Sequence, residues 1–340
     1  MIDRNRFFTP VDAPDIFSKI AHDHSILCMG SCFAETMGSL LEEHLFRACI
    51  NPFGILFNPA SMSKSLQRLQ SRKPYSEEDL FCADGLWESW DHHGSFAATS
   101  VTDSLNVINT RFIQGCEALA HCDVLVITFG TALTYEHSKT GAIVANCHKQ
   151  PSSLFSRRML SIEEIVADWS EVLTRLFTAR PNCSCIATVS PVRHVKSGAH
   201  ENLVCKSILV CALHELQKSF PRLFYFPSYE IMMDELRDYR FYGRDMVHPS
   251  DVAVDYLWDR FVESCVDENS KLFIREWESV RKAMHHHVSA HAAEATRNFT
   301  RAQLQTIGLL AKKYPEINFE KAVEYFQGLI AGHGTLSRHS

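Results

Sequence analysis

The 340-residue sequence has little that would mark a membrane protein or a nucleic-acid-binding protein. No apolar run approaches the roughly 20 residues that an α-helix needs to cross a bilayer. A net charge of −6 leaves no basic surplus of the kind that binds nucleic acid or an anionic membrane. Residues 1–15 have neither the apolar core nor the small-residue cleavage site of a signal peptide, so we expect a cytoplasmic protein.

Several chemical signatures are also missing. The chain has no glycine-rich phosphate loop of the Gly-x-Gly-x-x-Gly or Gly-x-x-x-x-Gly-Lys type, which disfavours a nucleotide-binding or transferase domain. Its 12 cysteines fall mostly within apolar segments, where we expect buried thiols in a reducing compartment. The Cys-His pair at 147–148 and the His-His pair at 92–93 lack the spacing of a zinc site. We predict no metal and no cofactor.

The chain does contain a regular alternation of short apolar segments and amphipathic helical patterns. Five apolar runs have the length of buried strands: 25–29, 46–50, 122–129, 183–189 and 222–226. Apolar residues that recur at three and four positions predict helices at 32–45, 104–120, 161–178, 201–219 and 252–265. This alternation predicts an α/β fold, doubly wound around a mainly parallel five-stranded sheet.

Two regions depart from the alternation. Residues 62–103 are interpreted as a long irregular insertion within an α/β domain that we place at 1–266. Over 267–340 the pattern is helical only, with helices predicted near 270–290, 298–313 and 318–331. We expect this C-terminal helical extension to supply no catalytic residue. Its histidine-rich segment at 284–291 is interpreted as a solvated helix face, because three consecutive histidines on a helix cannot face one metal.

The segments that follow the predicted strands concentrate small, polar and ionisable residues. In a parallel sheet these segments all lie at the carboxyl edge, where doubly wound folds bind their ligands. Helix capping does not explain such a concentration. The residues are Gly30, Ser31, Asn51, Gly54, Gly130, Thr131, Arg193, His194, Asp245 and His248.

Ser31 lies between the first predicted strand and the first predicted helix. It has two interpretations: an N-cap whose oxygen accepts a backbone hydrogen bond, or a nucleophile held at the end of a strand. A serine nucleophile needs a base, and the base needs a partner that fixes its tautomer. Asp245 and His248, three residues apart and just ahead of a helix, offer both groups at the same edge.

Two short motifs resemble those of a known family. GSCFA at 30–34 is similar to the motif that names the GSCFA family, of the SGNH or GDSL-like hydrolase superfamily. DMVHP at 245–249 resembles the closing Asp-x-x-His block of that superfamily. The resemblance covers roughly 25–265. It implies a serine esterase that works through an acyl-enzyme, with nucleophile Ser31, base and acid His248, and orienting carboxylate Asp245.

The resemblance also implies an oxyanion hole, and here the sequence departs from the superfamily pattern. That pattern uses the serine N–H, a glycine N–H after the second strand and an asparagine side chain after the third. Gly54 fits the glycine, but 130–132 has Gly-Thr-Ala where Gly-x-Asn is expected. The replacement donors we consider are the hydroxyl or N–H of Thr131 and the amides of Asn51, Asn58 and Asn146.

Other residues have both a structural and a functional interpretation. Cys32 is the rival nucleophile, although as the first residue of a helix its thiol should point away from Ser31. A further group consists either of substrate contacts or of ordinary loop and packing residues: His148, Lys149, Arg193, His194, Trp87, Trp90, His92 and His93.

The sequence therefore predicts a serine hydrolase that acts on an O-acyl or O-acetyl ester of a carbohydrate or small metabolite. Two alternatives stay open: a catalytically weak ligand-binding protein and a nucleotide-binding or transferase domain on the same scaffold. The expected partner is the small-molecule or carbohydrate ester, without nucleic acid or a membrane span. The sequence carries no signal for an oligomeric state.

Overall fold

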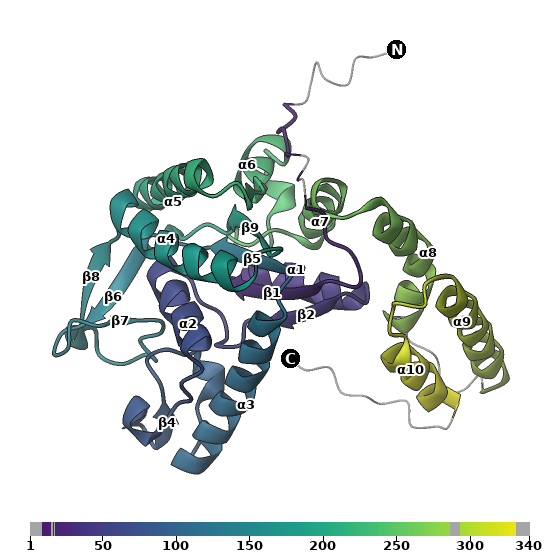
Figure 1. Cartoon of the computed structure of the whole chain (residues 1–340), viewed down its shortest axis with the longest axis horizontal. Helices are drawn as coiled ribbons and strands as arrows, with labels where there is room; N and C mark the ends of the chain where they lie inside the picture. The colour runs from purple at the N-terminus through teal and green to yellow at the C-terminus, as the bar shows by residue number, and fades with distance from the viewer. Residues whose placement is uncertain (1–8, 15, 17, 286–292, 331–340) are drawn as a thin grey trace.

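The computed structural model describes residues 9–14, 16, 18–285 and 293–330 (Figure 1). Its centre is a five-stranded parallel sheet in the order β10-β9-β5-β1-β2. The strands are β1 (Ser25–Gly30), β2 (Arg47–Ile50), β5 (Val124–Phe129), β9 (Ser184–Val189) and β10 (Leu223–Tyr225). These five strands and the α/β class confirm the prediction.

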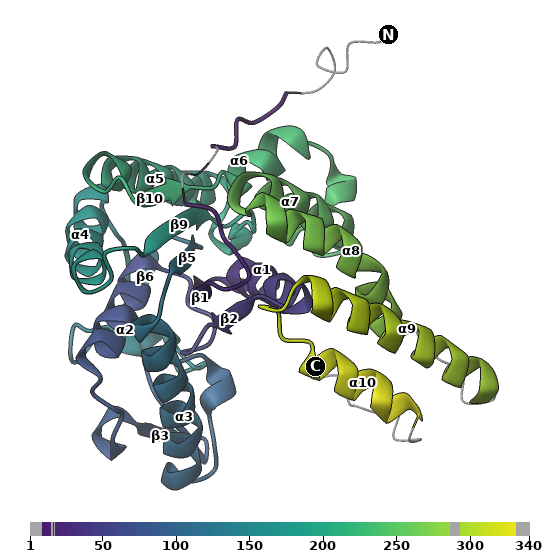
Figure 2. The same ribbon diagram turned by 45° about the vertical axis from the view of Figure 1, so that its right-hand side comes forward.

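The two faces of the sheet are covered by different helices (Figures 1 and 2). Leu27 and Met29 of β1 pack with α2 (Pro59–Ser71), α3 (Val101–Ala120), α4 (Ile162–Ala179) and α5 (Ala199–Ser219). Ile26 and Cys28 face the other way, toward α1 (Cys32–Glu43) and α7 (Asp251–Cys265). Strands that are buried on both faces have largely apolar sequences, which is why these strands could be predicted from the sequence.

Helix α4 begins as its sequence predicts. The Ser161 side chain accepts a hydrogen bond from the N–H of Glu164, and the Glu164 side chain accepts one from the N–H of Ser161. This reciprocal capping box satisfies two of the N–H groups that the first turn of a helix leaves unpaired.

The segment at 62–103 is more regular than the predicted irregular insertion. Its first part belongs to α2, which Asn58 caps by accepting the N–H of Ser61. The rest includes a hairpin of β3 (Phe81–Ala83) and β4 (Leu86–Glu88). The prediction was wrong for the helix because its buried face includes small serines among the apolar residues, which hides the periodicity: Ser61, Met62, Ser63, Ser65, Leu66 and Leu69.

A second sheet was not predicted. It is antiparallel, in the order β7-β6-β8, and consists of β6 (Leu133–His137), β7 (Ile143–Val144) and β8 (Phe155–Met159). Its strands carry charged side chains, among them Glu136 and Arg158, which form an ion pair across β6 and β8. Strands of this composition lack the apolar run used to find the central sheet.

The C-terminal helices stand to one side of the central sheet (Figure 2). They are α8 (Glu268–His285), α9 (Ala293–Lys313) and α10 (Glu320–Ile330), and they share a separate apolar cluster. Helix α8 contacts the end of α1, where the indole of Trp277 donates to the carbonyl of Glu43 at 2.8 Å. Most of the histidine-rich segment lies outside the described residues. Among the described helices, none has the length and apolar character needed to cross a membrane.

Candidate active site

Ser31 occupies the N-cap position of α1 but does not act as a cap. Its backbone is extended and its side chain makes no capping hydrogen bond. The residue is 1% exposed, and its Oγ has no hydrogen-bond partner among the described residues. Buried hydroxyl groups ordinarily find a partner. The capping interpretation therefore does not account for a serine at this position.

Gly30 is required by the close approach of β1 and β5. Its φ is +144°, and a Cβ atom there would lie 2.3 Å from the carbonyl oxygen of Thr128. The Gly30 N–H donates to Oδ1 of Asn51 at 2.9 Å, while Nδ2 of Asn51 donates to Glu35 at 2.6 Å. The Asn51 amide thus joins the Gly30 turn to α1. One N–H of Nδ2 is used by Glu35, and a role of Asn51 as an oxyanion donor stays a prediction.

The loop after β2 folds back over Ser31. Leu56 donates its N–H to the carbonyl of Gly30 at 2.9 Å. The Phe57 carbonyl accepts the N–H groups of both Gly130 (2.8 Å) and Thr131 (2.9 Å). A Cβ atom on Gly130 would lie 3.4 Å from the Cβ of Ser31. The structure thus brings the end of β5 and the loop after β2 against the serine.

The expected oxyanion donors differ in whether their N–H or O–H groups are already hydrogen-bonded within the protein. The Gly54 N–H donates to the carbonyl of Asn51 at 2.7 Å, so this donor is engaged. Thr131 accepts the N–H of Leu133 with its hydroxyl oxygen, which leaves the hydroxyl proton able to donate. In Asn58, Oδ1 caps α2, so the amide keeps Nδ2 as its donor.

Asp245 and His248 form the expected pair in the turn ahead of α7. Nδ1 of His248 lies 2.6 Å from Oδ2 of Asp245. Oδ1 of the same carboxylate accepts the N–H groups of Val247 (2.9 Å) and His248 (3.0 Å). These hydrogen bonds, first of all the one from the imidazole, hold the pKa of Asp245 well below its usual range. Nε2 of His248 is left for another partner.

The loop after β9 lies beside this turn. The Arg193 N–H points to the carbonyl of Val247 at 3.4 Å. The ring of His194 meets the ring of Phe57 edge-on at 5.7 Å. Burial, together with the charges of Lys206 and His248, lowers the pKa of His194 to about 4. Phe57 and His194 thus bring the loop after β2 and the loop after β9 into contact. No hydrogen bond joins the serine to His248 among the described residues, so their pairing stays a prediction.

Lys206 is a residue of this edge that sequence reasoning missed. It is 1% exposed, and its Nζ donates to the carbonyl oxygens of Gly130 (2.8 Å) and Ser190 (2.7 Å). Burial lowers the pKa of Lys206 to about 7. The sequence of α5 does indicate that Lys206 is buried. Its buried face has helical spacing, and two polar residues occupy positions on that face: Asn202, Lys206, Leu209, Leu213 and Leu216.

The rival nucleophile Cys32 is a poor one in this environment. Burial raises the pKa of its thiol, an effect that outweighs nearby backbone N–H groups and the charge of Lys206. The thiolate is the reactive form of cysteine. The environment of the site therefore favours Ser31 over Cys32.

Three residues that had both a functional and a packing interpretation pack against other parts of the chain. His92 is fully buried against the rings of Phe53, Tyr75 and Phe96, and burial lowers its pKa to about 3. His148 has a side chain that is 1% exposed, with Nε2 2.9 Å from the carbonyl of Ser89. Trp90 stacks on Phe81 with ring centres 3.7 Å apart. These contacts fit the packing interpretation of the three residues, and a substrate contact for any of them stays a prediction.

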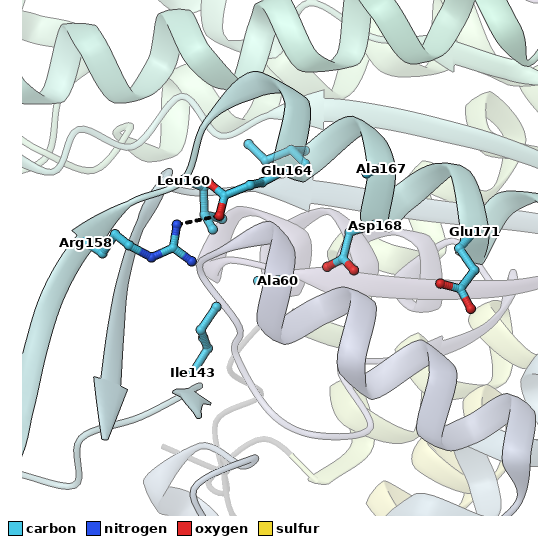
Figure 3. A pocket seen from close by; sticks show the side chains of 9 residues that line it. Ala60, Ile143, Arg158, Leu160, Glu164, Ala167, Asp168 and Glu171 are labelled. Carbon is cyan, nitrogen blue, oxygen red and sulfur yellow. Dashed lines mark hydrogen bonds and ion pairs between the residues drawn. The ribbon is translucent and has the colours of Figure 1, made fainter. Parts of the chain in front are cut away.

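A cavity of about 420 Å³ lies elsewhere, between α2, α4 and the second sheet (Figure 3). Figure 3 shows Arg158 paired with Glu164, and the carboxylates of Asp168 and Glu171 along α4. Neither Ser31 nor the Asp245–His248 turn lines it. Among the described residues, no group of three or more His, Cys, Asp or Glu side chains could hold a metal ion.

Comparison with known proteins gives two family matches. Residues 25–261 match the GSCFA family, and residues 277–331 match the C-terminal domain of GSCFA domain proteins. None of the curated proteins matches the chain. One similar solved structure is an acetyl xylan esterase (Est2A) from the rumen bacterium Butyrivibrio proteoclasticus. It is 11% identical with a TM-score of 0.31, over 72% of this chain and 65% of that one, too slight a likeness to assign an activity. The match over 25–261 shows that this chain belongs to the GSCFA family.

Proposed function

We propose that this protein is a serine esterase that hydrolyses an O-acyl or O-acetyl ester of a carbohydrate or small metabolite. The observation that carries the proposal is the Ser31 hydroxyl, which is buried without a partner at the carboxyl edge of the sheet. A hydroxyl in that position loses its hydrogen bonds to water and gains none from the fold. Such an arrangement suits a group that reacts there rather than one that stabilises a helix.

In the proposed mechanism Ser31 Oγ attacks the ester carbonyl carbon while Nε2 of His248 takes its proton. The bond to the alcohol oxygen then breaks, and His248 returns the proton to the leaving alcohol. Water attacks the acyl-enzyme, again with His248 as base, and releases the acid. Asp245 holds Nδ1 of His248 at 2.6 Å, which fixes the tautomer that has a free Nε2. The His248 side chain is 51% exposed, so it has room to turn toward the serine.

We assign the oxyanion contact to Nδ2 of Asn58, with the Thr131 hydroxyl as a second donor. Asn58 directly follows Phe57, whose carbonyl holds the Gly130–Thr131 peptide beside Ser31. Because Oδ1 of Asn58 is fixed by the first turn of α2, the amide nitrogen is fixed as well. A fixed donor of this kind typically contributes about 10²–10³ in turnover. Asn58 would then take the role of the asparagine missing after the third strand.

The test is ester hydrolysis by matched variants. We expect Ser31→Ala and His248→Asn to lose hydrolysis of acetylated sugars and aryl esters, with melting temperatures close to that of the wild type. Cys32→Ser is the matched control at the adjacent residue, and it should keep activity. Full activity in Ser31→Ala would contradict the proposal, and loss in Cys32→Ser alone would transfer the role to the thiol. Binding without turnover in the wild type would favour the alternative of a ligand-binding protein.

A further inference from the structure

Arg193 is a half-buried cation without a countercharge. Its Nε is buried without a partner, and its guanidinium makes no hydrogen bond or ion pair among the described residues. Seven other arginines are half-buried in the described chain, and the guanidinium of each donates to a carboxylate or a carbonyl: Arg68, Arg111, Arg158, Arg180, Arg222, Arg260 and Arg281.

The unpaired guanidinium of Arg193 by itself destabilises the folded state. A buried donor without a partner lowers the stability of the folded state, and it does so more strongly when the group is charged. Native proteins leave few such groups, and those that occur call for an explanation, such as a binding or catalytic role. The guanidinium of Arg193 therefore has unused binding capacity for an anion.

The position of Arg193 links it to the proposed active site. It lies directly after β9, and its N–H points to Val247, the residue before His248. The charge of Arg193 also acts on two phenols: burial raises the pKa of Tyr229 and of Tyr242, and the charge of Arg193 opposes both increases. The loop that carries Arg193 therefore adjoins the turn that carries the proposed base.

Both basic and acidic groups lie near Arg193. Lys206 lies buried at the same edge, and its charge lowers the pKa of His194, next to Arg193 in the chain. The nearby carboxylates are already engaged, because Asp245 binds His248 and Glu230 binds the hydroxyl of Tyr225 at 2.8 Å. Neither of these carboxylates pairs with the Arg193 guanidinium, so its positive charge is left to attract a negatively charged ligand.

We propose that the ester hydrolysed at Ser31 carries an anionic group, a carboxylate or a phosphate, that binds the guanidinium of Arg193. The inference rests on the proposed function and narrows its substrate class. The planar fork of arginine matches the two oxygens of a carboxylate or a phosphate, so binding would satisfy the unpaired Nε–H. Esters of sugar acids or of phosphorylated sugars have the required chemistry.

The experiment compares esters that differ in the anion. Acetylated glucuronic acid is matched with acetylated glucose, and acetylated glucose 6-phosphate separates phosphate from carboxylate. A second pair, 4-nitrophenyl hemisuccinate and 4-nitrophenyl butyrate, places the anion on the acyl side. Breaking a partly buried charged contact typically costs about 2–5 kcal/mol, so the wild type should prefer one anionic ester in kcat/KM by at least about 30-fold.

Variants of Arg193 test whether the preference for the anionic ester depends on this residue. Arg193→Gln should lose it, mainly through a higher KM for the anionic ester, with the neutral ester changed by less than about threefold. Arg193→Lys should restore part of it, because lysine keeps the charge but not the fork. Arg301→Gln is the control: it removes the same charge from an exposed site on α9 and should keep the preference.

The outcomes separate this inference from the proposed function. If Ser31 reacts with an uncharged fluorophosphonate but no anionic ester is preferred, the inference is wrong and the esterase proposal stands. If Arg193→Gln lowers the rates of anionic and neutral esters equally, the inference is also wrong. If no ester is hydrolysed and Ser31 is unreactive, the esterase proposal fails. Binding of glucuronate and glucose 6-phosphate, measured against glucose, then decides the inference, since equal binding of all three would overturn it.

Discussion

Replacing Lys206 by methionine tests whether this side chain is a buried amine that stabilises the carboxyl edge of the central sheet. Its Nζ holds the carbonyl groups of Gly130 and Ser190, and burial lowers its pKa to about 7 from an ordinary value of 10.5. Between these two pH values the folded chain binds fewer protons than the unfolded chain. The free energy of unfolding of the wild type therefore rises with pH across that window.

The size of the effect follows from the shift. Each pH unit within the window contributes about 1.4 kcal/mol, so Lys206 adds about 3 kcal/mol to wild-type stability between pH 7 and pH 9. Lys206→Met removes that gain and leaves two buried carbonyl groups without their donor, at about 1–3 kcal/mol each. We expect the variant to be several kcal/mol less stable at pH 9, with the difference about 3 kcal/mol smaller at pH 7.

Urea unfolding of both proteins at pH 7 and pH 9 measures this difference. Lys218→Met is the matched control on the same helix, because its side chain is 58% exposed and its ion pair with Glu215 is a surface contact. The control should change stability by less than about 1 kcal/mol at either pH. Parallel pH dependence in the wild type and in Lys206→Met would refute the buried-amine reasoning.

Three further predictions address other parts of the account. Gly30→Ala should prevent folding or lower stability by more than about 3 kcal/mol in a thermal melt, since its Cβ would overlap the Thr128 carbonyl, whereas Gly308→Ala in an open helical site should not destabilise. Burial lowers the pKa of His22 to about 4, so the stability present above pH 6.5 should fall by about 3 kcal/mol toward pH 4, and urea unfolding of His22→Gln should show a smaller acid loss. Asn58→Asp keeps the helix cap but removes the amide donor, so kcat should fall about 10²-fold while the melting temperature stays within a few degrees; unchanged kcat would exclude Asn58 from the oxyanion hole.

The sequence predicted the central fold because its strands are buried on both faces. Runs such as 124–129 are almost entirely apolar and are buried at every position, and the turns after them had to lie at one edge of a parallel sheet. Helix α2 was not predicted because its buried face contains serines, and the second sheet was not predicted because its strands carry charged residues that pair across the sheet. Tertiary contacts, which the local pattern does not encode, decided those elements.

The candidate site was predictable only where its geometry is local. Asp245 and His248 meet because the turn that joins them is three residues long. The roles of other residues depend on partners distant in sequence: Asn51 serves Gly30 and Glu35, and His148 packs beside Ser89. Such hydrogen bonds form between segments that come together only in the folded chain, so the spacing of residues in the sequence does not predict them.

The central claim is that Ser31 is the nucleophile, and the most direct measurement is the site of covalent labelling by a fluorophosphonate. The probe forms a bond from its phosphorus to the attacking oxygen and releases fluoride, so peptide mapping by mass spectrometry identifies the reacting residue. The account predicts a single adduct on Ser31 that is absent in Ser31→Ala and strongly reduced in His248→Asn. No adduct on Ser31 in folded protein, or equal labelling of the Ser31→Ala variant, would contradict it.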